Sequence, residues 1–109
     1  MKVYGPAVKT GVETIKRYGE LAAPDGDPGA AAQAWTDAGF DDAMTAKWLE
    51  ARCNDPQAAR ALTDLGVTPL QAAARTRDGG GDYRDTLAHK VAHGHLTPRQ
   101  VAARALSSR

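Results

Sequence analysis

The sequence predicts an all-α domain, in which a compact array of about six short helices follows an N-terminal amphipathic helix. Short polar residues that can cap a helix recur roughly every fourteen positions, and proline often follows them. Glycines occur where helices of ten or eleven residues would end. This regular succession of helix starts and stops, rather than strong hydrophobicity, indicates the fold class.

Length and composition limit what the domain can do. The 109 residues suffice for one domain with one core. Leu, Ile, Val and Phe together number only 16, whereas alanine alone numbers 22. Low apolar content predicts disorder only when net charge is high, and here the net charge is +1. We therefore expect a thin core of closely packed small residues, with little room for a small-molecule substrate or a cofactor.

The N-terminal stretch has helical spacing of its own. Val8, Val12 and Ile15 recur at the interval of one helix face, and charged residues lie elsewhere on the wheel. Gly11 weakens this helix by about 1 kcal/mol relative to alanine. We expect residues 1–21 to form an arm that docks on the rest of the chain or on a partner.

Two breaks rich in glycine and aspartate divide the chain. Residues 22–29 predict a linker after the arm, and a helical domain then covers residues 30–109. The second break, Asp78-Gly-Gly-Gly-Asp82, separates sub-units over 30–78 and 82–109. Whether the second sub-unit is a separate module or part of the same core is an open alternative.

Helix boundaries follow from the caps and the glycines. The candidate N-caps are Asp27, Asp41, Asp55, Thr68, Asp82 and Thr97. The helices that they predict cover residues 28–38, 42–53, 56–65, 69–77, 83–93 and 98–107. The residues expected to end them are Gly39, Asn54, Gly66, Gly79 and Gly94.

One eight-residue pattern occurs twice. Residues 68–75 read TPLQAAAR and residues 97–104 read TPRQVAAR, which agree at six of eight positions and lie 29 residues apart. Helices this short cannot bury a face alone, so they must pack on neighbours. We interpret the pattern as a helical repeat. The alternative is that good capping chemistry recurs by chance in alanine-rich helices.

The large aromatic residues lie close together in the sequence. Trp35, Phe40 and Trp48 fall within fourteen positions, and in an alanine-rich chain they are the obvious anchors of the core. Phe40 is expected in a turn, where an exposed aromatic residue is also typical of a binding anchor. Core and binding surface are therefore both open for this cluster.

One segment resembles a known family. The run Ala38-Gly39-Phe40, then Leu49, then Asn54-Asp55-Pro56 and Ala59 is similar to ubiquitin-associated (UBA) three-helix domains, in which a Gly-Phe turn joins the first two helices. The resemblance covers residues 31–65 and implies a three-helix fold. The family's ligand surface would include the turn and the outer face of the third helix. Its residues here would be Ala38, Gly39, Phe40, Leu62 and Leu65.

A helix-turn-helix motif that binds DNA is the first alternative. Residues 58–65, the turn at Gly66-Val67 and residues 68–77 have suitable lengths, and the half of the chain after residue 50 carries nine basic and five acidic groups. The side chains that would reach bases or phosphates are Gln71, Arg75 and Arg77.

Catalytic and metal chemistry have little support. His89 and His93 share a helix face and His95 follows, but no cysteine or carboxylate lies close in sequence to complete a metal site. The glycine run after residue 78 lacks the lysine partner of a phosphate loop. No spacing indicates a nucleophile with a base. We therefore expect no enzyme activity and no metal.

Targeting signals are not apparent. A single cysteine, Cys53, cannot form an internal disulfide, and no apolar run approaches the roughly 20 residues that span a bilayer. The first residues lack the apolar segment of a secretion signal. We expect a cytoplasmic location without membrane contact.

These observations together predict a non-catalytic interaction module or adaptor that binds another protein. The expected contact is the Gly39-Phe40 turn with the end of the third helix. The DNA-binding regulator is one alternative. A small inhibitor from a mobile element, which covers a partner's surface, is another.

Overall fold

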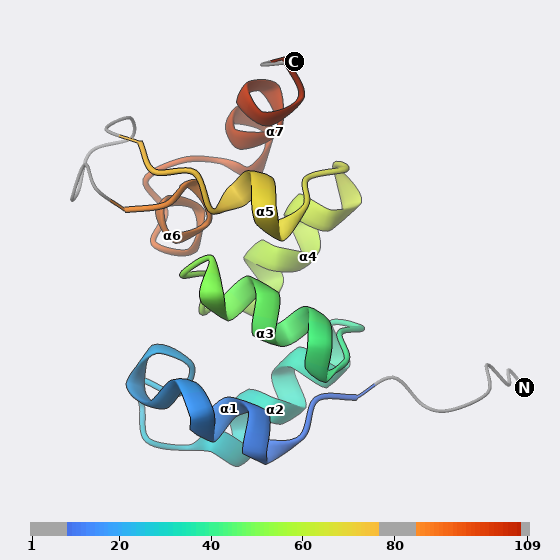
Figure 1. The fold of residues 1–109 in the computed structure, drawn as a ribbon, viewed down its shortest axis with the longest axis vertical. Helices are drawn as coiled ribbons and strands as arrows, with labels where there is room; N and C mark the ends of the chain where they lie inside the picture. The colour runs from blue at the N-terminus through green and yellow to red at the C-terminus, as the bar shows by residue number, and fades with distance from the viewer. Residues whose placement is uncertain (1–8, 77–84, 108–109) are drawn as a thin grey trace, which may run out of the picture.

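The computed structural model describes residues 9–76 and 85–107, and over these ranges the chain is all-α (Figure 1). A 3₁₀ turn, Gly19–Leu21, follows the first helix. One isolated antiparallel bridge joins Arg75 and Thr86. The predicted fold class is confirmed. The α-helices are α1 (Val12–Tyr18), α2 (Pro28–Asp37), α3 (Asp42–Glu50), α4 (Pro56–Asp64), α5 (Pro69–Ala72), α6 (Leu87–Ala92) and α7 (Pro98–Ser107).

Polar side chains cap the helices where the sequence predicts them. The carboxylates at the starts of α2, α3 and α4 each accept a hydrogen bond from a first-turn amide, and threonine does the same for α5 and α7. The capping residues are Asp27, Asp41, Asp55, Thr68 and Thr97. Asp82 lies outside the described residues. The predicted start of the next helix at residue 83 is wrong, because α6 begins at Leu87 with Thr86 as its cap.

The predicted end of one helix, α3, is also wrong. Gly39, Gly66 and Gly94 do end their helices, with φ of 90°, 87° and 80°. However, Arg52, with φ of 70°, takes the left-handed conformation after α3 that was expected at Asn54. Gly79 lies outside the described residues.

α5 is much shorter than predicted. It stops at Ala72 rather than at residue 77. The Ala74 carbonyl accepts from the Leu87 amide at 2.8 Å, and the Thr76 amide donates to the Asp85 carbonyl at 3.0 Å. This pairing with the segment before α6 takes the backbone groups that further helical turns would need.

The N-terminal arm docks on the rest of the chain. α1 packs against both α2 and α3, and Ile15 is fully buried there. Before α1, the Thr10 hydroxyl donates to the Phe40 carbonyl at 2.9 Å, and its oxygen lies 2.6 Å from the Thr45 hydroxyl. The Thr10 amide donates to the Thr36 hydroxyl at 2.9 Å. The hydrogen bonds of Thr10 therefore connect the N-terminal arm to the turn between α2 and α3.

A residue of α3 caps α1. The N-cap position of α1 is Gly11, which has no side chain to accept a hydrogen bond. Instead, Asp42 Oδ1 accepts from the Gly11 amide at 2.8 Å and from the Thr14 hydroxyl at 2.6 Å. These two hydrogen bonds, first that of Thr14 and then that of Gly11, lower the pKa of Asp42. Helix α1 thus depends on α3 for its start.

The helices form two groups with α5 at the junction. α4 packs on α6 and α7, whereas α1 lies against α2 and α3. α5 contacts α3 on one side and both α6 and α7 on the other. In Figure 1, α1 and α2 lie at one end of the long axis and α7 lies at the other, with α5 and α6 at a similar level between α7 and α3.

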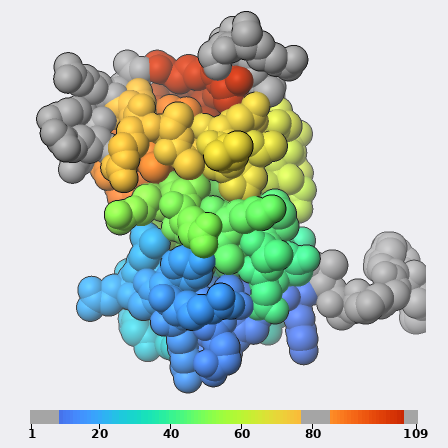
Figure 2. All heavy atoms as spheres, in the orientation of Figure 1, coloured from blue at the N-terminus to red at the C-terminus, as the bar shows by residue number. Residues whose placement is uncertain are grey.

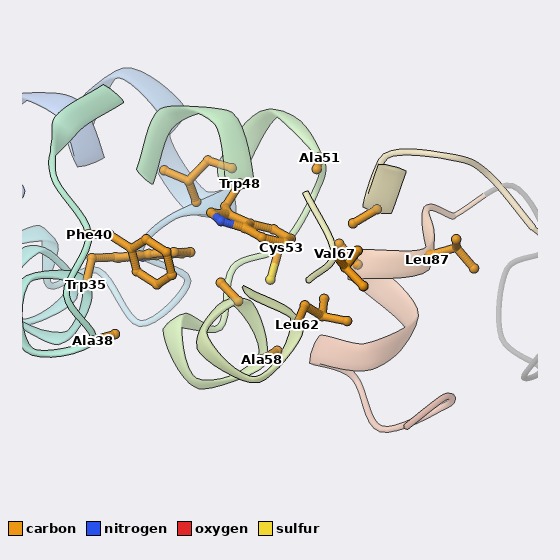
Figure 3. Packing of buried hydrophobic residues seen from close by; sticks show 14 of the residues in the cluster. Trp35, Ala38, Phe40, Trp48, Ala51, Cys53, Ala58, Leu62, Val67 and Leu87 are labelled. Carbon is orange, nitrogen blue, oxygen red and sulfur yellow. The ribbon is translucent and has the colours of Figure 1, made fainter. Parts of the chain in front are cut away.

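The aromatic cluster is part of the core. Trp35 and Trp48 are fully buried, and the Phe40 ring meets Trp35 edge-on with ring centroids 5.4 Å apart (Figure 3). Leu62 of α4 closes the same cluster. Ten of the 21 buried apolar side chains among the described residues are alanines, so helices approach closely around a few large anchors.

Candidate functional site

The Gly39-Phe40 turn is not an exposed binding surface. Phe40 is 3% exposed and Ala38 is buried, while Gly39 is exposed. The Arg60 guanidinium lies over the Phe40 ring, 5.5 Å from its centroid, and donates to the Ala38 carbonyl at 3.1 Å. Asp64 holds Arg60 by a 2.7 Å ion pair. A partner cannot reach Phe40 in this conformation, so this part of the predicted contact is wrong.

The end of the third predicted helix is only partly accessible. Leu62 is fully buried in the core and cannot be a contact residue. Leu65 is half-buried and packs against the core from outside. Both leucines serve the packing of α4, because the same helix face meets α6 and α7. The predicted surface is therefore reduced to Gly39 and the edge of Leu65.

The proposed DNA-reading helix is too short for that role. A recognition helix presents several side chains to the major groove, but α5 has four residues, a little over one turn. Gln71 uses its side chain to accept from the Thr68 amide in a capping box. Arg75 lies beyond the helix, in the bridge with Thr86. Arg77 lies outside the described residues.

The histidines and the cysteine show no reactive arrangement in the described ranges. His89 and His93 stack with ring centroids 4.1 Å apart. The expectation that no carboxylate is close in sequence is wrong, because Asp85, four residues before His89, lies 3.2 Å from it. Burial and then His93 lower the pKa of His89, and Asp85 opposes them. No group of three or more His, Cys, Asp or Glu side chains described there is placed to hold a metal ion. Burial raises the pKa of Cys53 to about 12, so its thiol stays protonated.

An apolar groove lies between α3 and α5, and we call it the α3–α5 groove. Its volume is about 540 Å³, and its walls are mostly apolar. Leu70 stands beside it with 85% of its surface exposed, the most exposed large apolar side chain among the described residues. The lining residues are Met44, Lys47, Glu50, Ala51, Thr68, Pro69, Leu70 and Ala73.

Local sequence explains how this groove forms. Pro69 and the Thr68 cap start α5 immediately after the tight turn at Gly66, so α5 lies across α3. Leu70 is the second residue of α5 and points outward, and Arg99 at the same position of α7 is exposed as well. A second hollow of about 390 Å³, lined partly by Leu70, Gln71 and Arg104, lies next to Leu70. Leu70 is therefore a ridge between two hollows.

Charged side chains border the α3–α5 groove. Lys47 and Glu50 are both exposed on α3. Glu50 accepts a hydrogen bond of 2.8 Å from the Tyr18 hydroxyl of α1, and that hydrogen bond is the main cause of the raised pKa of Tyr18. The groove thus has an apolar floor and a border with both charges, which is a common arrangement for burying an apolar side chain of a partner.

Sequence reasoning did not select this groove, although the repeat held a signal for it. Within the matching stretches, Leu70 occupies the third position and Arg99 occupies the same position in the other copy. Both residues are exposed. An exposed arginine is ordinary, whereas an exposed leucine at the same position gains no burial from the fold.

Comparisons with known proteins give no further information on function. No protein-family model, no curated protein and no solved structure matches this chain. The similarity of residues 31–65 to UBA domains therefore stays a prediction. Within the part of the chain that the structure describes, no helix has the length and apolar character needed to cross a membrane.

Proposed function

We propose that this chain is a non-catalytic protein-interaction module that binds a partner through the α3–α5 groove. The observation that carries the proposal is the exposure of Leu70, 85%, at the edge of a mostly apolar groove. Contiguous apolar surface with a polar rim marks interaction sites, and here the half-buried Met44, Pro69 and Ala73 adjoin Leu70 in the groove. This proposal replaces the predicted contact through Phe40 and Leu62, whose side chains are buried.

The internal repeat supports a role other than folding for Leu70. The copy of this position, Arg99, is compatible with the same capped helix start. The fold therefore does not require leucine at residue 70. Truncating a leucine that is already exposed in the free protein would cost little stability, so its substitution tests binding separately from folding.

The groove favours a partner that offers one or two apolar side chains. Met44, Pro69 and Ala73 form walls that exclude water once a side chain enters, while Lys47 and Glu50 at the border fix its orientation. An adaptor and a small inhibitor would both use such a surface. The identity of the bound protein separates these two functions.

Photo-crosslinking from the groove tests the proposal. A benzophenone amino acid at position 47 is expected to capture a discrete protein partner in cells, because Lys47 lines the groove and is exposed. Adding L70R, which copies the other repeat, should abolish the capture while the circular dichroism spectrum is unchanged. The same probe at Val12, 38% exposed on α1, is the matched control. Capture that persists with L70R, or no capture, contradicts the proposal.

A further inference from the structure

We infer that the α3–α5 groove binds a second copy of this chain, related by a two-fold axis that turns the copies end for end. This inference rests on the proposed function, since it names the partner of the same groove. Three features carry it: the segregation of charge, the place of the groove between the charged halves, and the self-complementary form of the Leu70 ridge.

Charge is unevenly divided along the chain. Residues 1–50 carry five basic and eight acidic side chains, and residues 51–109 carry nine basic and five acidic ones. The two halves therefore have net charges of −3 and +4. When two molecules with such opposite ends pack side by side, they attract each other if their directions are reversed.

The fold turns this division of sequence into a division of space. Within the described residues, the acidic half contains α1–α3 with four basic and eight acidic side chains, and the basic half contains α4–α7 with six basic and three acidic ones. The two halves lie toward opposite ends of a long axis of 39 Å, and α3 and α5 meet where the halves join (Figure 1). A two-fold axis through the groove and perpendicular to the long axis places each acidic half over a basic half. A two-fold axis along the long axis would oppose like charges.

The surface at the centre can pair with itself. In a two-fold interface each copy both gives and receives the same contact. Leu70 projects next to a groove of about 540 Å³, so each copy can insert its leucine into the groove of the other. No other protein has to supply the apolar side chain that the groove favours.

The molecule is also flat enough for such a dimer. Its extents are 39, 32 and 18 Å, and α3 and α5 are both exposed on the broad face in Figure 2. That face exceeds the roughly 800 Å² that each partner gives to an interface of standard size. Face-to-face packing therefore offers the area that a stable dimer requires.

Sedimentation equilibrium of the full chain is the first test. We expect a dimer for the wild type and a dissociation constant about a thousandfold higher for L70R, because two copies of the anchor are lost at once. The double variant L70R/R99L keeps the composition but moves the leucine to α7, and it should remain as weak as L70R. Raising NaCl from 50 mM to 1 M should weaken the wild-type dimer about tenfold.

A spin label tests the orientation. Lys16 on α1 is exposed and accepts a cysteine for labelling, while the native Cys53 is buried and unreactive. Mixed with unlabelled, ¹⁵N-enriched wild type, K16C carrying the label should broaden resonances of the basic half, including α7, and leave those of α1 sharp. Broadening confined to α1 would overturn the end-for-end arrangement.

The outcomes separate this inference from the proposed function. A wild type that stays monomeric, together with capture of a different protein from position 47, refutes the second copy and leaves the interaction module standing. A dimer that L70R leaves intact also refutes the inference. No capture from position 47 at all removes both proposals.

Discussion

α5 and α7 start from nearly the same eight residues and become different helices. In each, the threonine hydroxyl accepts from the amide of the glutamine three residues later, at 3.1 Å, and the glutamine side chain accepts from the threonine amide, at 2.9 Å for α5 and 2.8 Å for α7. Yet α5 has four residues and α7 has ten. Matching sequence thus sets where a helix begins, and contacts further along the chain set where it ends.

The contacts that end α5 come from the segment before α6. Thr86 pairs with Arg75 in an isolated antiparallel β-bridge, and the Leu87 amide donates a hydrogen bond to the Ala74 carbonyl. The Thr86 hydroxyl holds this segment in place, because it donates to the buried Ala51 carbonyl at 2.5 Å and accepts from the His89 amide at 3.0 Å. The last residue of α5, Ala72, is fully buried, which anchors this short helix to the core.

Of the substitutions that test this comparison, Thr86→Ala should destabilise the protein most. It removes the cap of α6 and leaves the Ala51 carbonyl without its hydroxyl donor, a loss of about 3 kcal/mol in the free energy of unfolding. Urea unfolding measures it. Thr86→Ser keeps the hydroxyl and should lose much less. Equal losses for alanine and serine would assign the effect to the methyl group instead.

Substitutions at the fifth position of the repeat should have the next largest effect on stability. Ala72 and Val101 are equivalent, and both are fully buried. We expect Val101→Ala to cost about 2 kcal/mol by removing two methyl groups from the core. Ala72→Val should also destabilise, by about 1–3 kcal/mol, because the junction under α5 has no space for them. Thermal unfolding of both variants is the measurement, and a stabilised Ala72→Val would show unfilled space there.

The caps should have smaller and equal effects. Thr68→Ala and Thr97→Ala each remove one capping box, worth about 1 kcal/mol. Helical circular dichroism near the midpoint should fall more for Thr97→Ala, because α7 has more residues to fray. If only one variant loses stability in urea, the two boxes are not equivalent.

Leu70→Arg should have the smallest effect on folding. It converts the third position of α5 into that of α7, and we expect the free energy of unfolding to change by less than about 0.5 kcal/mol. Urea unfolding at a concentration where the wild type is monomeric measures this value. A larger loss would mean that Leu70 supports the fold of the isolated chain.

Local signals were readable from the sequence, whereas long-range ones were not. The caps at Asp27, Asp41 and Asp55 depend on neighbours within three residues, so the pattern predicted them. The early end of α5 depends on a segment more than ten residues away. The residue that takes the left-handed conformation after α3 is Arg52, two residues before Asn54, the residue that the sequence predicted for this role.

The candidate site was predicted less well than the fold. The sequence of a Gly-Phe turn is the same whether its aromatic residue faces solvent or the core. In this fold Phe40 is covered by Arg60 of α4, a contact that the local sequence does not indicate. Leu70 and Arg99 were visible as a difference between the two repeats. Their meaning depended on exposure, which only the fold supplies.

The cap that Asp42 gives to α1 has a consequence for the order of folding. A seven-residue helix whose N-cap residue is glycine is unstable alone, and its capping carboxylate is 31 residues away from that glycine. Loop closure must therefore precede the helix, so α1 should form late and open first. In native-state hydrogen exchange, its amides should lose protection in a step of their own, ahead of those in α3.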